Sequence, residues 1–198
     1  MLHASNRDLL YDCLEAVQKV IDELGIRGVI IGGVAVALLS KPRATLDVDA
    51  MMLLDTDRIP DLLAVSQKHG LIPRISDIES FARRSRVVLL KHEPTGIGVD
   101  ISLGILPFEV EVVDRAIERK AGRISVCLAG PEDLIILKAV AHRPVDFVDI
   151  QSLVTAWPNL DRDRIRKCVQ EFAEVMESPE LWDDIAPLLG NPQGASDS

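Results

Sequence analysis

The sequence has no apolar run long enough to cross a lipid bilayer. Its longest uncharged stretch, residues 28–40, has thirteen residues, whereas a membrane-spanning helix needs about twenty. Near the start of the chain, Arg7, Asp8 and Asp12 interrupt the apolar segment that a secretory signal would require. We therefore expect a protein of the cytoplasm that has no membrane partner.

Cysteine is scarce and its spacing fits neither a metal site nor a disulfide framework. Cys13, Cys127 and Cys168 are far apart, and none belongs to a CxxC pair. We expect reduced, mostly buried thiols. The sequence also contains no Walker loop, no zinc-ligand spacing and no Ser/His/Asp or Cys/His arrangement, which excludes the enzyme classes that those motifs mark.

Basic residues are outnumbered by acidic ones. Lys and Arg total 22 and Asp and Glu total 31, so the formal net charge is −9. A protein that coats polyanions would be basic overall, and this class is excluded, although a local basic groove is not. Hydrophobic residues make up 47% and charged residues 27% of the 198. These values are typical of a globular protein with one core.

Hydrophobic periodicity predicts an α/β core followed by helices. The elements expected in the core are a helix at 6–24, a strand at 29–31, a short helix at 34–39, a strand at 46–54, a helix at 60–68, a hairpin of strands at 86–91 and 97–103, and a strand at 124–128. Further helices are expected at 131–141, 145–157, 162–176 and 181–189. The predicted organisation is a core over 1–129, a helical part over 130–189 and a frayed tail over 190–198.

Three aspartates are candidates for a shared site. Asp47 and Asp49 are two residues apart in a predicted strand, so both side chains lie on the same face. Asp100 lies between apolar residues in another predicted strand. If the strands are neighbours, like charges about 4 Å apart repel by roughly 1 kcal/mol in water and roughly 4 kcal/mol at an effective dielectric constant of 20. Such a cluster needs a proton or a cation, and carboxylate oxygens favour Mg²⁺ or Mn²⁺.

A glycine pair precedes these aspartates. Gly32 and Gly33 end a predicted buried strand and begin a helix, where backbone N–H groups and the positive end of the helix could bind a phosphate. Taken singly, these features have alternatives: a solvated strand face for the aspartates and an ordinary tight turn for the glycines. A DxD pair also occurs in phosphatases and glycosyltransferases, but in the phosphatases it follows the first strand directly.

The order of these motifs resembles that of the polymerase-β-type nucleotidyltransferase superfamily. Its signature is hG[GS], a spacer, Dh[DE]h and a third acid on a later strand. This chain has Gly32-Gly33, thirteen further residues, Asp47-Val48-Asp49 and then Asp100. The segments 131–138 and 143–150 are similar to the minimal, AbiEii-type members that are associated with toxins.

The resemblance implies a fold and a set of site residues. The fold would be a nucleotidyltransferase-type mixed α/β sheet flanked by helices and followed by a C-terminal helical set. Asp47, Asp49 and Asp100 would be catalytic and would bind Mg²⁺ or Mn²⁺, and Asp100 would also help to deprotonate an acceptor hydroxyl. The implied nucleotide-binding residues are Gly32, Gly33, Thr45, Lys138 and Asp146.

The activity implied is Mg²⁺-dependent transfer of a nucleoside monophosphate from a nucleoside triphosphate to RNA or tRNA, a protein or a small molecule. A toxin–antitoxin role would add a cognate partner protein. The alternative is a degenerate member that binds nucleotide or a partner without chemistry, because Gly33 stands where many active members have serine. Asp146 and Asp149 share a helical face and either pair with Lys138 or Arg143 or contact the nucleotide.

Overall fold

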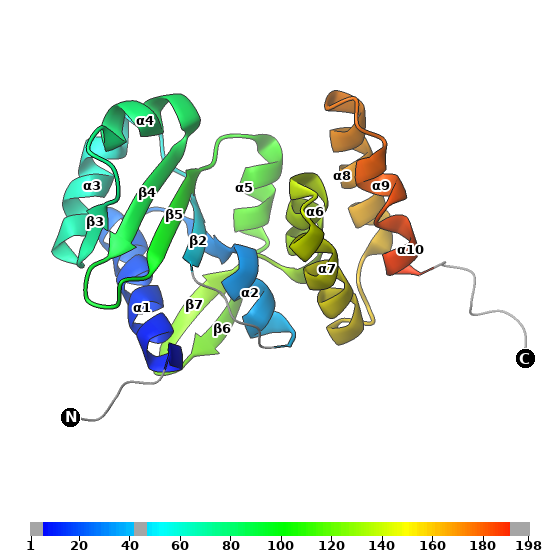
Figure 1. The fold of residues 1–198 in the computed structure, drawn as a ribbon, viewed down its shortest axis with the longest axis horizontal. Coiled ribbons are helices and arrows are strands. Elements are labelled where there is room, and N and C mark those ends of the chain that lie inside the picture. Colours follow the sequence, from blue (N-terminus) through cyan, green and yellow to red (C-terminus); the bar gives the residue numbers. More distant parts are fainter. Residues whose placement is uncertain (1–5, 42–46, 191–198) are drawn as a thin grey trace, which may run out of the picture. The chain divides into compact units, whose positions relative to one another are not determined.

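The computed structural model describes residues 6–41 and 47–190. The chain divides into two compact units. Unit 1 comprises Met1–Leu38 and Arg43–Gly130, and unit 2 comprises Leu39–Pro42 and Pro131–Ser198. The sheet lies in unit 1 and unit 2 is helical (Figure 1).

One mixed sheet forms the centre of unit 1. Its strands are β1 (Gly28–Ile31), β2 (Asp47–Met52), β3 (Leu71–Pro73), β4 (Val87–His92), β5 (Gly98–Leu103), β6 (Ile117–Ala121) and β7 (Ile124–Leu128). In the described residues, their order across the sheet is β3-β4-β5-β2-β1-β7-β6. β2 runs parallel to β5 and antiparallel to β1, and β4 and β5 form the predicted antiparallel hairpin. The predicted class, a mixed α/β sheet flanked by helices, is confirmed.

Helix α1 covers one face of this sheet. The helices that begin in unit 1 are α1 (Asn6–Leu24), α2 (Gly32–Leu39), α3 (Ile59–Lys68), α4 (Ile78–Ser85) and α5 (Pro107–Asp114), with a 3-10 turn, η1, at Thr56–Arg58. α1 lies beside α3 and contacts β2 and β7. Side-chain atoms of Ile21 in α1 and Met52 in β2 both approach Gly28. The β2 residues on this face, Val48, Ala50 and Met52, are fully buried.

The opposite face of β2 becomes less exposed along the strand. Asp47 is exposed, Asp49 is half-buried and Met51 is only 2% exposed. α5 contacts β2, and Glu109 of α5 and Met51 both approach Gly104. The accessible end of this face within unit 1 therefore carries the two carboxylates.

Unit 2 consists of helices packed around apolar side chains. They are α6 (Pro131–Ala141), α7 (Pro144–Ala156), α8 (Arg162–Val175), α9 (Glu180–Asp183) and α10 (Ala186–Leu189). α6 packs against α7 and α8, and α8 packs against α9. Leu134, Ile135 and Ile136 of α6 are fully buried. The helices predicted at 131–141, 145–157 and 162–176 are present as α6, α7 and α8, whereas the one predicted at 181–189 is divided into two short helices, α9 and α10. Across residues 6–41 and 47–190, no helix combines the length and apolarity needed to span a membrane.

Besides the 3-10 turn η1, four elements were not predicted from the sequence: β3, α4, α5 and β6. β3 has three residues and ends in Pro73. β6 has the sequence Ile-Glu-Arg-Lys-Ala, whose charges are tolerated because it is an edge strand. α5 alternates apolar and acidic residues like a strand, but Pro107 occupies its first turn. Glu109 then accepts hydrogen bonds from the N–H groups of Ile105 (2.7 Å) and Leu106 (2.8 Å) and fixes the start of the helix.

Candidate active site

Strand pairing brings the three predicted aspartates onto one face of unit 1. β2 and β5 run parallel in register, with Asp49 opposite Asp100 and Asp47 opposite Gly98. Residues that are paired in this way project to the same side of a sheet, as do residues two apart along one strand. Asp47, Asp49 and Asp100, called the acid cluster below, therefore lie on one face of two neighbouring strands.

The two strands fit together closely because Gly98 has no side chain. A Cβ at position 98 would overlap the Asp47 carboxylate, whose Cγ would lie only 3.2 Å away. The carboxylate of Asp47, a residue of β2, thus lies over β5, the strand that carries Asp100. Burial raises the pKa of Asp100, and the negative charge of Asp47 raises it further, whereas Arg74 acts in the opposite direction. The environment of Asp100 is therefore unfavourable for its negative charge.

Arg74 supplies a positive charge to this cluster. Its backbone N–H donates to the carbonyl oxygen of Leu89 (3.0 Å), which places it next to β4 at the end of β3. Leu89 is in turn opposite Asp100. The Arg74 guanidinium reaches past Leu89 and donates to Oδ1 of Asp100. Sequence reasoning did not identify Arg74, because no local motif marks a residue that comes near Asp100 only through the pairing of three strands.

Gly32 lies directly beside Asp49. Its φ of 67° is in the left-handed region, which glycine adopts readily. A Cβ at position 32 would overlap the Asp49 carboxylate, with Cγ at 2.7 Å. Gly32 and Gly33 are the first two residues of α2, as predicted, so the positive end of this helix begins next to the carboxylate. Thr45, the other predicted nucleotide-binding residue in this region, lies outside the described residues.

The acid cluster has the donor chemistry of a divalent-cation site. Carboxylate oxygens are the ligands that Mg²⁺ and Mn²⁺ prefer, and glycines at 32 and 98 leave room for the Asp49 and Asp47 carboxylates. In the described residues, no three His, Cys, Asp or Glu side chains stand in an arrangement that would hold a metal ion. Asp100 is bound by Arg74 instead. The carboxylate chemistry of the acid cluster suits such an ion, whereas the arrangement of its side chains in the described residues does not assemble the site.

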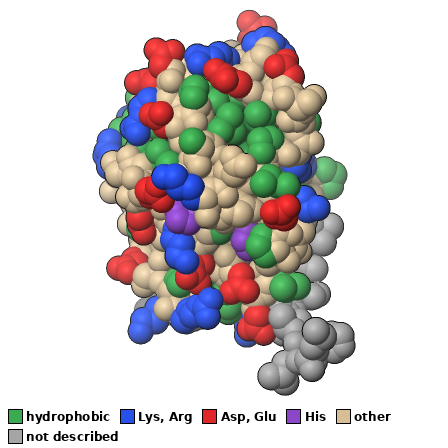
Figure 2. Space-filling view, turned by 90° about the vertical axis from the view of Figure 1, so that its left-hand side faces the viewer, with side chains coloured by type: hydrophobic (Ala, Val, Ile, Leu, Met, Phe, Trp, Pro, Cys, Tyr) green, Lys and Arg blue, Asp and Glu red, His purple; other side chains and the backbone are tan. Residues whose placement is uncertain are grey.

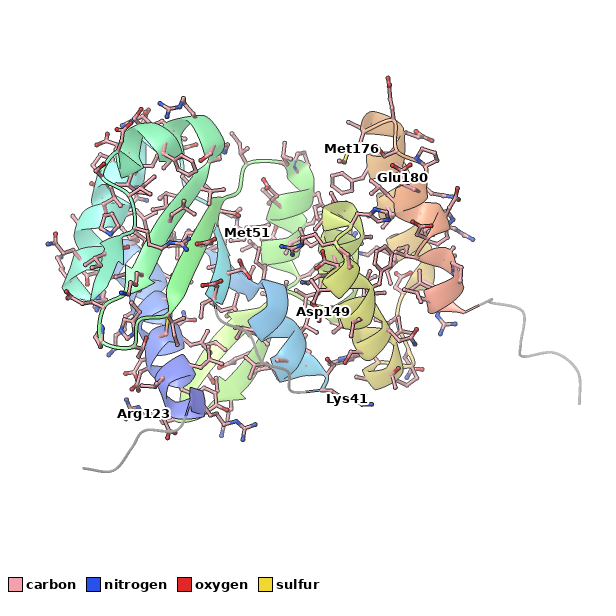
Figure 3. The ribbon with its side chains drawn as sticks, in the orientation of Figure 1. Lys41, Met51, Arg123, Asp149, Met176 and Glu180 are labelled. Atoms are coloured by element: carbon pink, nitrogen blue, oxygen red, sulfur yellow. The ribbon has the colours of Figure 1, made fainter. Side chains whose placement is uncertain are left out.

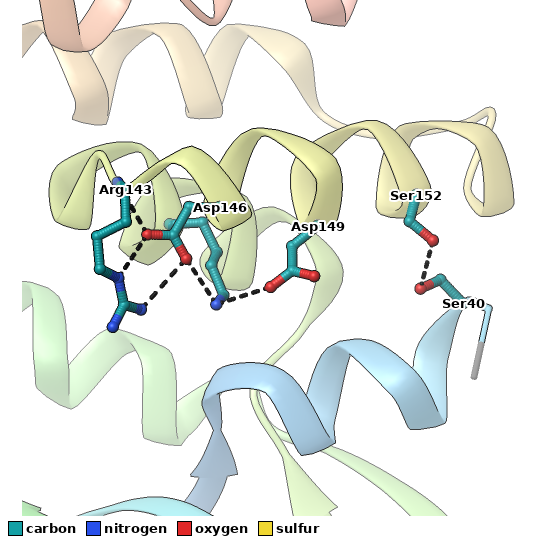
Figure 4. Close-up of polar contacts among 6 residues, drawn as sticks. Ser40, Arg143, Asp146, Asp149 and Ser152 are labelled. Carbon is teal, nitrogen blue, oxygen red and sulfur yellow. Dashed lines mark hydrogen bonds and ion pairs between the residues drawn. The ribbon is translucent and has the colours of Figure 1, made fainter. Parts of the chain in front are cut away.

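The other predicted nucleotide-binding residues, Lys138 and Asp146, form a buried ionic network in unit 2 (Figure 4). The Lys138 side chain is 5% exposed, and its Nζ donates to Oδ1 of Asp146 (2.8 Å) and lies 2.9 Å from Oδ2 of Asp149. Asp146 also accepts from the backbone N–H (3.0 Å) and Nε (2.8 Å) of Arg143. Burial alone would raise the pKa of Asp146, but the hydrogen bonds from Arg143 and Lys138 hold it below its usual value.

This network matches one of the two alternatives that the sequence left open, the structural pairing of Lys138 with the aspartates of α7. Asp149 projects from the same helix (Figure 3). The predicted contact of Lys138 and Asp146 with a nucleotide stays a prediction.

A hollow of about 430 Å³ lies in unit 1, between α1, the end of α3 and the turns after β4 and β6. Its lining includes Lys68, His69 and Arg123. Lys68 pairs with Glu23 of α1 and Arg123 pairs with Glu15 (3.0 Å), and the His69 ring also contacts Glu23 (2.8 Å). Figure 2 shows acidic and basic side chains next to one another on this side of the molecule. The paired charges make the hollow a weaker candidate than the acid cluster.

Residues 9–184 match a protein family described as "Nucleotidyltransferase of unknown function (DUF6036)". The chain belongs to this nucleotidyltransferase family. The superfamily resemblance of its glycine and aspartate motifs is thereby confirmed, whereas the AbiEii-type association stays a prediction. A comparison with curated proteins gives no match.

Solved structures of other nucleotidyltransferases share the fold of this DUF6036 member. The antibiotic-resistance factor ANT(2'')-Ia has a TM-score of 0.57 and 17% sequence identity, over 87% of this chain and 97% of that one. A nucleotidyltransferase-like antigenic protein from Paracoccidioides brasiliensis has the same TM-score and identity, over 92% of each chain. The lincosamide adenylyltransferase LnuA, solved with lincomycin bound, has a TM-score of 0.50 and 14% identity, over 77% of this chain and 98% of that one.

Proposed function

We propose that the protein is a divalent-cation-dependent nucleotidyltransferase that transfers a nucleoside monophosphate from a triphosphate to a hydroxyl group of an acceptor. The observation that supports this most directly is the acid cluster: Asp47, Asp49 and Asp100 on one face of neighbouring parallel strands, with the start of α2 beside Asp49.

Each residue of the site would have a distinct task. Asp47 and Asp49 would hold Mg²⁺ or Mn²⁺, which when bound neutralises charge on the phosphates and makes a hydroxyl more acidic. The N–H groups at the start of α2, at Gly32 and Gly33, would bind phosphate oxygens, because they lie at the positive end of the helix. Asp100 would bind the cation and accept the proton of the acceptor hydroxyl.

We propose adenylyl as the transferred group and a small hydroxyl-bearing molecule as the acceptor. ANT(2'')-Ia has been solved in complex with adenylyl-2''-tobramycin, and LnuA is an adenylyltransferase that binds lincomycin. Both structures align over 98% of their own length with this chain. RNA or tRNA and protein acceptors are the competing predictions, and a cognate partner protein and a cytoplasmic location stay predictions.

The test is a transfer assay with α-phosphate-labelled ATP, GTP, CTP and UTP, with Mg²⁺, Mn²⁺ or EDTA. The acceptor panel would contain aminoglycosides, lincosamides, tRNA and protein. We expect cation-dependent release of pyrophosphate and a labelled small-molecule product with ATP, both lost in Asp49→Asn. Asp57→Asn is the matched control, because Asp57 is 96% exposed in η1 and lies outside the acid cluster. Equal activity of Asp49→Asn and wild type would refute the proposal.

A degenerate, nucleotide-binding member is the second candidate, and one observation favours it: Asp100 is already neutralised by Arg74. Calorimetric titration with each triphosphate separates the two candidates. Cation-dependent binding that is lost in Asp49→Asn, without pyrophosphate release for any acceptor, would support the degenerate protein instead of the enzyme.

A further inference from the structure

The Arg74 guanidinium binds the carboxylate of Asp100, one of the three carboxylates of the acid cluster. It donates to Oδ1 of Asp100, and its Nη1 lies 3.4 Å from the point that a Cβ of Gly98 would occupy. The same point is overlapped by the Asp47 carboxylate. One guanidinium therefore lies beside two of the three carboxylates that are expected to bind the cation.

The strand register explains how Arg74 reaches this place. One row of residues crosses the sheet from the residue after β3 to β2. It consists of Arg74, directly after β3, Leu89 of β4, Asp100 of β5 and Asp49 of β2. Arg74 spans β4 to reach Asp100, and the missing side chain of Gly98 leaves space for the guanidinium over β5. The side chains of Arg74 and Asp100 are 33% and 37% exposed, so the pair is accessible to solvent and to ions. A pair this exposed is weak enough to exchange.

We propose that Arg74 is an internal counter-ion of the acid cluster, which neutralises Asp100 in the metal-free protein and competes with the divalent cation for that carboxylate. This inference rests on the metal site of the proposed function. A guanidinium and a divalent cation at the same carboxylate repel each other at short range, because both are positively charged. Arg74 on Asp100 thus opposes binding of the cation, and the metal affinity of the protein is lower than the three carboxylates alone would give.

The experiment is calorimetric titration of Mn²⁺ into wild type, Arg74→Ala, Arg27→Ala and Asp49→Asn at fixed ionic strength. Arg27→Ala is the matched control, because Arg27 also pairs with an aspartate in unit 1, Asp114, and its removal changes the net charge equally. We expect Arg74→Ala to bind Mn²⁺ about fivefold more tightly than wild type, as expected from an exposed ion pair. Arg27→Ala should bind like wild type, and Asp49→Asn should lose binding.

Thermal unfolding gives an independent readout. In EDTA, Arg74→Ala should melt at a lower temperature than wild type, because the carboxylates lose the positive charge of the guanidinium. Addition of Mn²⁺ should raise the melting temperature of Arg74→Ala more than that of Arg27→Ala. If Arg74→Ala does not fold, Arg74→Gln removes the charge and keeps most of the side chain. Arg74→Gln is then titrated with Mn²⁺ in place of Arg74→Ala, with the same expected result.

The outcomes separate this inference from the proposed function. Unchanged Mn²⁺ affinity in both Arg74 variants, with binding lost in Asp49→Asn, overturns the counter-ion role and leaves the metal site standing. If the Arg74 variants bind Mn²⁺ and wild type does not, the counter-ion role is supported, because Arg74 then blocks the site completely in wild type. Absence of binding in every protein, Arg74 variants included, overturns the counter-ion role and the metal site together.

Discussion

The carboxylate of Asp49 lies where the Cβ of any other residue at position 32 would lie, so Gly32, the first residue of α2, and Asp49 of β2 form a matched pair. Two requirements meet at Gly32: a left-handed backbone, with φ at 67°, and a missing side chain. The pair couples the turn proposed to bind phosphate to a carboxylate proposed to bind the metal ion, and a side chain at position 32 would displace that carboxylate.

Gly32→Ala should therefore cost both stability and activity. A left-handed alanine costs about 1–2 kcal/mol, and displacement of Asp49 adds to this. The matched control is Gly25→Ala, because Gly25 has a similar φ of 60° but no atom within 4 Å of its Cβ position. Urea unfolding and the transfer assay would be run on both variants. Equal stability losses, with transfer retained in Gly32→Ala, would contradict the coupling.

Lys138→Met should strongly destabilise unit 2. The substitution leaves the carboxylates of Asp146 and Asp149, each 1% exposed, without the ammonium that both contact. Breaking a buried ion pair on one side costs about 3–5 kcal/mol. Lys167→Met is the control, because Lys167 is 77% exposed in α8. Urea unfolding measures the difference. A variant with wild-type stability but weakened nucleotide binding would favour the nucleotide-contact role of Lys138.

Asp146→Asn should reduce stability in a pH-dependent way. Burial opposes ionisation, but hydrogen bonds from Arg143 and Lys138 place the pKa of Asp146 below its ordinary value of 3.8. A carboxyl whose pKa is lower in the folded state stabilises the protein above the unfolded pKa, and this contribution disappears as the pH falls through the folded pKa.

The free-energy difference between wild type and Asp146→Asn, about 1–3 kcal/mol for lost charged hydrogen bonds, should thus be constant from pH 7 to about 5 and shrink below about pH 4. Urea titrations at several pH values measure it. A free-energy difference that grows on acidification would contradict the lowered pKa of Asp146 in the folded protein.

Cys13 should react with thiol reagents only when the protein unfolds. Its side chain is fully buried in α1, and burial raises its pKa to about 12, so the reactive thiolate is suppressed at pH 8. Cys127 and Cys168 are half-buried. Alkylation followed by peptide mass spectrometry should modify Cys13 in guanidinium chloride but not in buffer. Labelling of native Cys13 as fast as Cys168 would be inconsistent with this burial. The expectation that the cysteines are mostly buried holds fully for Cys13 alone.

Local patterns predicted much of this protein because they depend on few residues. The two-residue period of a strand places Asp47 and Asp49 on one face whatever the fold around them. Helical periodicity and Gly25 define α1, where the N–H of Ile26 donates to the carbonyl oxygen of Ile21 (3.3 Å) just past its end. These features follow from backbone geometry, which the sequence carries directly.

Only the tertiary structure decided which strands are neighbours. Asp49 lies opposite Asp100 because β2 and β5, about fifty residues apart in the chain, pair in parallel. Arg74 reaches Asp100 across β4, and Gly98 leaves it room, although neither residue stands out in its local sequence. Strand order and register result from the packing of the whole sheet. The sequence by itself therefore determined the carboxylates of the candidate site, and the fold selected the arginine that neutralises one of them.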